Sequence, residues 1–194
     1  MKKPKRLRIS APMLILLAFL LITDRTGVGA LTLLAALLHE CGHLAAAWGM
    51  GVTPEQLRLD LLGARMEIRG RVLSYGEEIW LAAAGPLASL LLFGVGACFW
   101  ELAAARVLAC ASLLLGLLNL LPIRSFDGGR MLESFLSATV GVGAARRVMT
   151  GTSFVSLLLL WGTAVYFLLR AADGLSLLCF SLSLFFRFFE NEHF

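Results

Sequence analysis

The stretch "LLHECGHLAA", residues 37–46, places two histidines and a glutamate in a run of otherwise mostly apolar residues. His39 and His43 are four positions apart, so on a helix they lie on one face, one turn apart. Two imidazoles placed in this way can bind one zinc ion, and Glu40 can act as general base on the water that the metal activates. The stretch therefore predicts a helix that carries part of a metal site in apolar surroundings.

The composition places this helix in a membrane. The chain has 194 residues, of which 59% are hydrophobic and 15% are charged. Soluble domains contain roughly 45–50% apolar and about 25% charged residues. The net charge of +4 comes from basic clusters beside apolar runs, which indicates membrane topology and excludes a nucleic-acid partner. The four cysteines are scattered without a CxxC pair, so we expect neither a disulfide framework nor a thiolate zinc site.

The apolar runs predict an all-α polytopic membrane protein with about six transmembrane helices. The expected spans are 9–23, 28–48, 78–99, 103–121, 153–169 and 174–189. With both termini in the cytoplasm, the outside segments hold only three of the 17 Lys and Arg residues, namely Arg25, Arg106 and Arg170. This charge distribution satisfies the positive-inside rule. We therefore expect a single membrane-embedded domain, 1–194, in the cell membrane, with its active site toward the cytoplasm.

The segment between the second and third predicted spans has a different pattern. Residues 57–69, "LRLDLLGARMEIR", alternate apolar and polar positions on either side of Gly63. This alternation predicts a short cytoplasmic β-hairpin, and a solvated loop remains the alternative. A hairpin there could pair with an extended substrate strand.

A catalytic zinc ion needs a third protein ligand and an open position for water. Asp127 is the best candidate, because the second and fourth predicted spans both run inward and so end at the same side of the membrane. Pro122 ends the preceding helix, and Gly128 and Gly129 allow the backbone to bend sharply after the aspartate. We expect one zinc ion per chain.

Three motifs in this order resemble the site-2 protease family of intramembrane zinc metalloproteases. HExxH in a spanning helix is followed by the Gly-Pro segment "AAAGPLASLLL", 82–92, and then by Asn-x-x-Pro-x-x-x-x-Asp-Gly in "NLLPIRSFDGGR", 119–130. The span count and the short loop are most similar to the stage IV sporulation protein FB branch, without its CBS domain. The resemblance implies that Glu40 is the catalytic acid/base and that Asn119 lies near the active site, where it could orient substrate. The zinc ligands that it implies are His39, His43 and Asp127.

The chain departs from the family pattern at two places. Arg124 and Ser125 stand before the aspartate, where many members have more prolines. Ser89 stands in the Gly-Pro segment at a position where members often carry asparagine. These departures put the rigidity of the aspartate loop and any role of position 89 in question.

The expected function is therefore zinc-dependent cleavage of a membrane-tethered protein within the bilayer. The resemblance implies regulated intramembrane proteolysis, with a pro-sigma or anti-sigma factor as a candidate substrate and a membrane regulatory protein as a candidate partner. One alternative is a metal-ion transporter, although such proteins show repeated helices with corresponding polar breaks, and the two breaks here are dissimilar. The other alternative is a catalytically inactive relative that only binds a partner.

Overall fold

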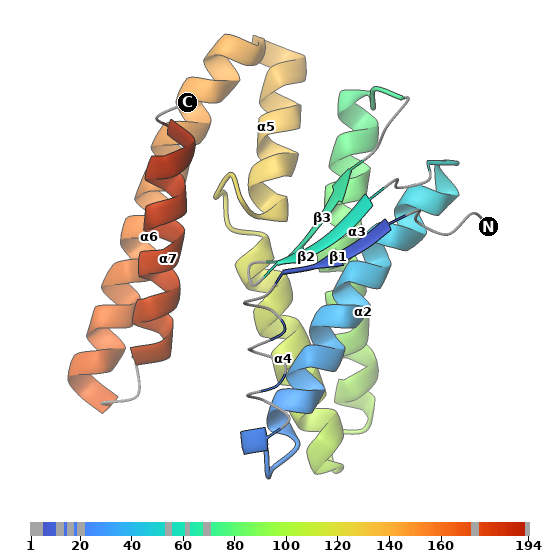
Figure 1. The fold of residues 1–194 in the computed structure, drawn as a ribbon, viewed down its shortest axis with the longest axis vertical. Coiled ribbons are helices and arrows are strands. Elements are labelled where there is room, and N and C mark those ends of the chain that lie inside the picture. Colours follow the sequence, from blue (N-terminus) through green and yellow to red (C-terminus); the bar gives the residue numbers. More distant parts are fainter. Residues whose placement is uncertain are drawn as a thin grey trace. The chain divides into compact units, whose positions relative to one another are not determined.

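The structure is a computed structural model, and it describes residues 6–10, 14, 18, 22–52, 56–60, 63–67, 71–171 and 175–192. In this part of the chain there are six helices and three strands (Figure 1). The residues form two compact units, Met1–Leu120 and Leu121–Phe194, and each unit is described by itself.

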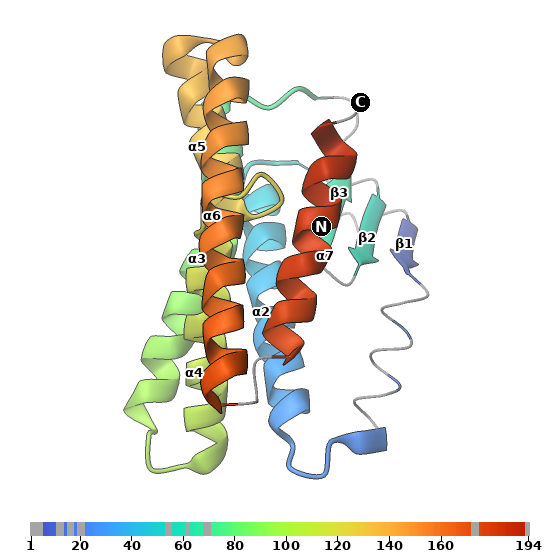
Figure 2. The ribbon, with the colours of Figure 1, turned by 90° about the vertical axis from the view of Figure 1, so that its left-hand side faces the viewer.

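The first unit contains three helices that pack on one another and a small sheet. The helices are α2 (Val28–Gly49), α3 (Tyr75–Cys98) and α4 (Ala103–Asn119). The strands β1 (Arg6–Ile9), β2 (Gln56–Asp60) and β3 (Gly63–Glu67) lie to one side of these helices (Figure 2). The sheet order is β1-β2-β3, with β1 parallel and β3 antiparallel to β2.

The start of α2, the helix that carries the histidine motif, is fixed by a side chain from the preceding turn. Gly27 at the N-cap has a φ of 75° and no side chain to cap the helix. Instead the Asp24 carboxylate accepts a hydrogen bond from the Ala30 N–H at 2.9 Å. This bond holds the pKa of Asp24 below its usual value, so the carboxylate stays charged and satisfies a helix-terminal donor.

The three helices approach closely because small residues lie between them. A Cβ atom at Gly42 of α2 would lie 2.5 Å from the Ala84 carbonyl oxygen and 2.7 Å from the Ala88 Cβ, both on α3. A Cβ atom at Gly96 of α3 would lie 2.8 Å from the Ala109 Cβ on α4. Such contacts between small residues are typical of helices that associate in membranes.

In these helices small residues are buried and large apolar residues are exposed, which is the reverse of the pattern in soluble proteins. The buried side chains of these helices include many alanines and serines, whereas large apolar side chains are exposed, for example Leu91 at 71%. Lipid provides the surroundings that such an exposed apolar surface requires. Among the residues that the structure describes, three helices are long and apolar enough to cross a membrane: Val28–Gly49, Tyr75–Cys98 and Val142–Arg170.

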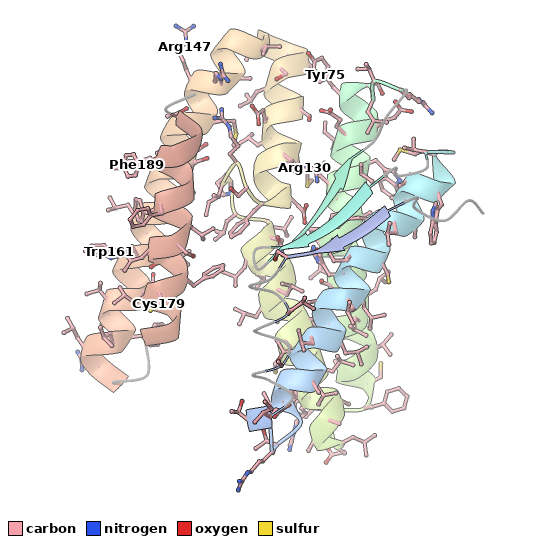
Figure 3. All side chains as sticks on the ribbon, viewed as in Figure 1. Tyr75, Arg130, Arg147, Trp161, Cys179 and Phe189 are labelled. Atoms are coloured by element: carbon pink, nitrogen blue, oxygen red, sulfur yellow. The ribbon has the colours of Figure 1, made fainter. Side chains whose placement is uncertain are left out.

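The second unit consists of α5 (Asp127–Val140), α6 (Val142–Ala171) and α7 (Leu175–Glu192). Gly141, with a φ of 86°, separates α5 from α6. The α6–α7 pair packs through aromatic contacts, in which Phe154 lies 6.3 Å from Phe185 between ring centroids. Figure 3 shows Trp161 and Phe189 on the left-hand side of this pair.

The prediction of six spans is not supported by the described residues. Helix α4 has 17 residues and is about 26 Å long, less than the roughly 30 Å of a hydrocarbon core. Helix α7 has 18 residues but includes Arg187, Glu190 and Glu192, so it is not among the spanning candidates. Most of the expected span 9–23 lies outside the described residues, and Ile9 belongs to β1.

The stretch 122–151, between the expected spans 103–121 and 153–169, is mostly helical. It contains all of α5 and the first turns of α6. The polar residues there form one face of an amphipathic helix, so low mean hydropathy at this place does not indicate a loop.

The sheet is more extensive than the predicted hairpin. Antiparallel pairing of β2 with β3 occurs where the alternation suggested it, with Leu57 opposite Met66, while residues 61–62 lie outside the described part. The strand β1 was not predicted, although "RLRI" has the same period-two pattern as β2. The fold class is therefore helical with a three-stranded sheet, and the side of the membrane on which the sheet lies stays a prediction.

Candidate metal site

The two predicted histidine ligands lie on one buried face of α2. Ala35, His39, His43 and Ala47 are spaced by four residues, and all are buried. His39 is 3% exposed and His43 is 7% exposed. Their ring centroids are 5.0 Å apart with an interplanar angle of 81°. The helical spacing thus brings the imidazoles together as the sequence predicts.

Helix α3 supplies a hydrogen-bond partner to the Nδ1 atom of each ring. The His43 Nδ1–H donates to the Leu81 carbonyl oxygen at 2.8 Å, and a carbonyl can only accept, so the proton of a neutral His43 is on Nδ1. The Nδ1 atom of His39 is 2.9 Å from Ser89 Oγ. With its proton on Nδ1, His43 keeps the lone pair of Nε2 for a metal ion, and the Ser89 contact holds the ring of His39.

Gly85 of α3 leaves space at the two Nε2 atoms. A Cβ atom at this position would lie 2.7 Å from His39 Nε2 and still closer to His43 Nε2. Both imidazole rings therefore pack directly against the backbone of α3 at Gly85, where any side chain would collide with them. The missing side chain is what allows the two rings to lie together on this face of α3.

The supporting residues of α3 share one helix face. Leu81, Gly85 and Ser89 are four residues apart, as are the histidines on α2. The sequence motifs predict no role for Gly85 and leave that of Ser89 in question. The matching four-residue spacing of small residues was the available signal, but the sequence does not show which helix faces the histidines.

Glu40 and Asn119 are the other predicted residues of this unit. Glu40 directly follows His39 on α2 and is half-buried. Asn119 ends α4 and is also half-buried, and its Nδ2 donates to the Leu115 carbonyl oxygen at 3.0 Å. This bond fixes the amide to its own helix, so the substrate-orienting role of Asn119 stays a prediction.

Asp127 is the first residue of α5 and is 7% exposed. A carboxylate at a helix N-terminus is stabilised by the helix dipole, and Arg130 Nη1 lies 3.9 Å from Asp127 Oδ1. The prediction that the following glycines form a sharp bend is wrong, because both are helical. At Gly129 a Cβ atom would collide with the Ile123 carbonyl, so this glycine allows close packing.

The donor set has the composition of a catalytic zinc site. His39 and His43 are buried in the first unit, and Asp127 is buried in the second. Two imidazoles and one carboxylate, with a further position for water, are the ligands found in several zinc hydrolases. The residues that the motifs predict therefore fit zinc in chemical type and burial.

The contact between Ser89 and His39 leads to a testable prediction. We expect Ser89→Ala to weaken zinc binding by roughly ten- to a hundredfold, because the partner that orients a metal-ligating histidine is lost. Zinc affinity of the purified protein, measured by competition with a chelating dye, would show this.

A second buried serine provides the matched control. The Ser112 hydroxyl donates to Leu108 of its own helix, α4, at 2.7 Å, so we expect Ser112→Ala to bind zinc like the unaltered protein. Equal zinc affinities for the two variants would contradict a role of Ser89 at the metal.

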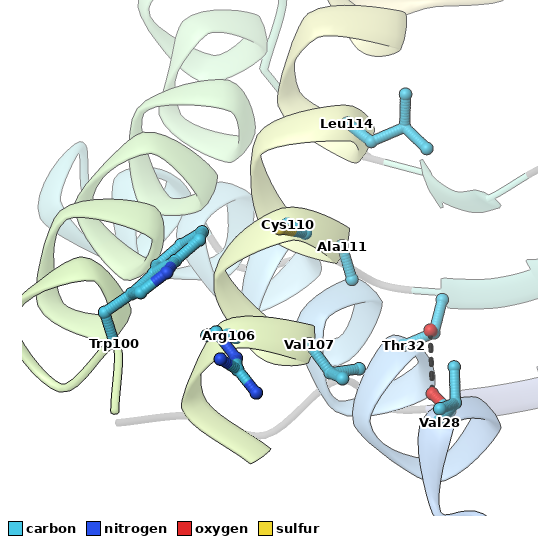
Figure 4. Close-up of a pocket in the computed structure, with 8 residues that line it drawn as sticks. All are labelled: Val28, Thr32, Trp100, Arg106, Val107, Cys110, Ala111 and Leu114. Atoms are coloured by element: carbon cyan, nitrogen blue, oxygen red, sulfur yellow. Dashed lines mark hydrogen bonds between the residues drawn. The ribbon is translucent and has the colours of Figure 1, made fainter. Parts of the chain in front are cut away.

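The structure also contains a hollow away from the histidines, with a volume of about 460 Å³ (Figure 4). It lies beside the start of α2 and the first turns of α4, where Thr32 donates to the Val28 carbonyl oxygen at 2.8 Å. Arg106 is the charged residue among its otherwise largely apolar lining. None of the predicted site residues lines this hollow.

Comparisons with known proteins agree with the motifs. Residues 101–163 match the model of Peptidase family M50. Rip3 of Mycobacterium tuberculosis, whose name describes it as a zinc metalloprotease, is 38% identical over 136 residues, which cover 61% of this chain and 35% of Rip3. The zinc metalloprotease MJ0392 of Methanocaldococcus jannaschii is 28% identical over 144 residues, covering 68% of this chain and 41% of that protein.

The chain thus spans well under half the length of these curated relatives. Among solved structures, a site-2 protease from Methanocaldococcus jannaschii matches with a TM-score of 0.64 and 21% identity, and the match covers 98% of this chain and 92% of the other. This match shows a shared fold. Together the findings support the resemblance to the M50, or site-2 protease, family, while the sporulation branch stays a prediction.

Proposed function

We propose that this chain is a zinc-dependent intramembrane metalloprotease of the site-2 protease type. The observation that carries the proposal is the pair of Nδ1 hydrogen bonds from α3, which hold the two buried imidazole rings together against Gly85. The match to Peptidase family M50 supports it. The surrounding helices are apolar enough to cross a membrane, so the reaction would occur within or at the edge of the bilayer.

The proposed metal ligands are His39, His43 and Asp127. Zinc, when bound, lowers the pKa of water to about 7 and polarises the scissile carbonyl. Glu40 then accepts the proton of the attacking water and delivers it to the leaving amine nitrogen. Asn119 orients the substrate at the end of α4. Since all five residues lie on helices, each is held on a rigid element.

The proposed substrate is a membrane-tethered protein, with a pro-sigma or anti-sigma factor as candidates and regulated intramembrane proteolysis as the process. A helical substrate hides its amides in internal hydrogen bonds, so it must become extended before cleavage. The strand β3 lies at the edge of the sheet order β1-β2-β3, and an edge strand offers the hydrogen-bonding groups that an extended segment needs.

Metal removal tests the proposed activity. We expect the purified full chain, reconstituted with a membrane-tethered reporter, to lose cleavage when treated with a zinc chelator and to regain it when zinc is restored. The reason is that both the nucleophilic water and the polarised carbonyl depend on the metal. Gel analysis of the reporter fragments measures the result.

Two outcomes would contradict the protease proposal. Cleavage that continues after zinc has been removed, with no zinc left in the protein, would exclude a metalloprotease. Zinc uptake into protein-containing vesicles without any cleavage would instead favour the transporter alternative. An inactive binding protein would show neither cleavage nor uptake.

A further inference from the structure

The loop before Asp127 is held by a buried side chain that none of the motifs contains. Ile123 and Phe126 of this loop are 3% and 6% exposed, so its two apolar side chains are buried. Within the loop, the backbone hydrogen bonds join residues close in sequence: the Phe126 N–H donates to the Ile123 carbonyl oxygen at 2.8 Å. Longer-range contacts must therefore fix the loop against the helices.

Ser153 of α6 makes such contacts with two consecutive parts of the loop. Its Oγ accepts a hydrogen bond from the Arg124 N–H at 3.0 Å and donates to the Pro122 carbonyl oxygen at 3.4 Å. Ser153 is fully buried. Serine hydroxyls within helices commonly bond to a carbonyl of their own helix, as Ser181 of α7 does with Leu178 at 2.9 Å. Ser153 instead bonds to the loop.

The loop is in turn packed directly on the first turn of α5. A Cβ atom at Gly129 would collide with the carbonyl of Ile123 and lie 2.8 Å from the Arg124 nitrogen. The Arg130 N–H donates to the Phe126 carbonyl oxygen at 3.1 Å. The segment from Pro122 to Arg130 therefore moves as one body, and Asp127 lies within it. A displacement of the loop at Arg124 would displace the carboxylate.

We propose that Ser153 is a positioning residue for Asp127, acting through the backbone of residues 122–126. This inference rests on the proposed function, since it takes Asp127 to be a metal ligand. The chain has Arg124 and Ser125 where prolines would stiffen the loop, and the Ser153 hydroxyl supplies the restraint from α6 instead. Loss of the hydroxyl leaves the part-buried Arg124 N–H without this acceptor, so the loop must shift to find another one.

Zinc affinity tests the inference, with Ser153→Ala as the variant and Ser181→Ala as the matched control in the same unit. We expect the first to weaken zinc binding roughly tenfold, as the loss of an outer-shell partner does, and the second to leave it unchanged. Equal affinities for the two variants overturn the proposal.

A double-mutant cycle separates positioning from a general structural effect. If Ser153 acts through Asp127, then Ser153→Ala has no further effect on zinc affinity in an Asp127→Ala background. A further tenfold loss in that background overturns the proposal. If Asp127→Ala alone leaves zinc affinity unchanged, the proposed ligand set fails and the inference fails with it. If only Ser153→Ala is without effect, the ligand set stands and the inference alone fails.

Hydrogen exchange of the unaltered full chain provides a readout that needs no variant. The Arg124 amide, bonded to a fully buried oxygen, is expected to exchange at least a hundredfold more slowly than an exposed amide. Exchange at the rate of an exposed amide overturns the proposal.

Discussion

Replacing Glu40 by glutamine is expected to lower the cleavage rate by about a thousandfold, within the range that general acid–base catalysis contributes. Glutamine has nearly the same size, so the packing of α2 is retained, but its amide cannot accept the proton of the attacking water. The metal ligands are unchanged, and zinc binding should persist with one ion per chain. Cleavage of a membrane-tethered reporter, together with the zinc content of the purified variant, measures both effects.

The neighbouring residue supplies the control for this variant. Cys41 lies next to Glu40 on α2 and is exposed, so Cys41→Ser should cleave at the rate of the unaltered chain. If Glu40→Gln retains zinc and still cleaves at the normal rate, the acid/base assignment is wrong.

The histidine pair could be predicted from the sequence because its geometry is local. Four residues on a helix fix the relation between His39 and His43 whatever surrounds them, and the structure places both rings on one buried face. Helices α2, α3 and α4 also lie close to the expected apolar runs, since a long run of apolar residues can satisfy its backbone in lipid only as a helix.

The partners of the histidines could not be predicted in the same way. Ser89 is 50 residues from His39 in the chain, and Leu81 is 38 residues from His43. Which residues meet across α2 and α3 depends on the depth and rotation of each helix, and small residues such as Gly42 set both by allowing close approach. A single sequence shows the small residues but not the register of one helix against the other.

The strand β1 and the helix α5 were missed for different physical reasons. Strand β1 is stabilised by pairing with residues about fifty positions away, from Arg6 with Gln56 to Ile9 with Leu59, and four residues carry too little pattern to predict such pairing. Helix α5 is amphipathic, so the mean hydropathy that identifies spanning helices is low over its length.

The Gly85→Ala variant, which adds one methyl group, is expected to lose zinc binding. Its zinc affinity should fall by more than about a hundredfold, which is the upper end of what the loss of an outer-shell partner causes. In the Gly85→Ala variant the new Cβ would lie 2.7 Å from His39 Nε2 and closer to His43 Nε2. The rings must rotate away from the methyl group, which breaks their bonds to Ser89 and Leu81 and separates the two nitrogens. Isothermal titration with zinc and reporter cleavage should both show the loss.

Gly94→Ala on the same helix is the control, because it introduces alanine into α3 without placing a methyl group against the histidines. A Cβ atom there has nothing within 4 Å, and alanine favours a helix over glycine by about 1 kcal/mol, so Gly94→Ala should bind zinc normally and melt no lower. Overpacking in Gly85→Ala costs about 1–3 kcal/mol, part of which the same helix preference offsets, so the variant should fold. A folded Gly85→Ala protein with normal zinc affinity would show that the two Nε2 atoms do not bind the metal in this arrangement.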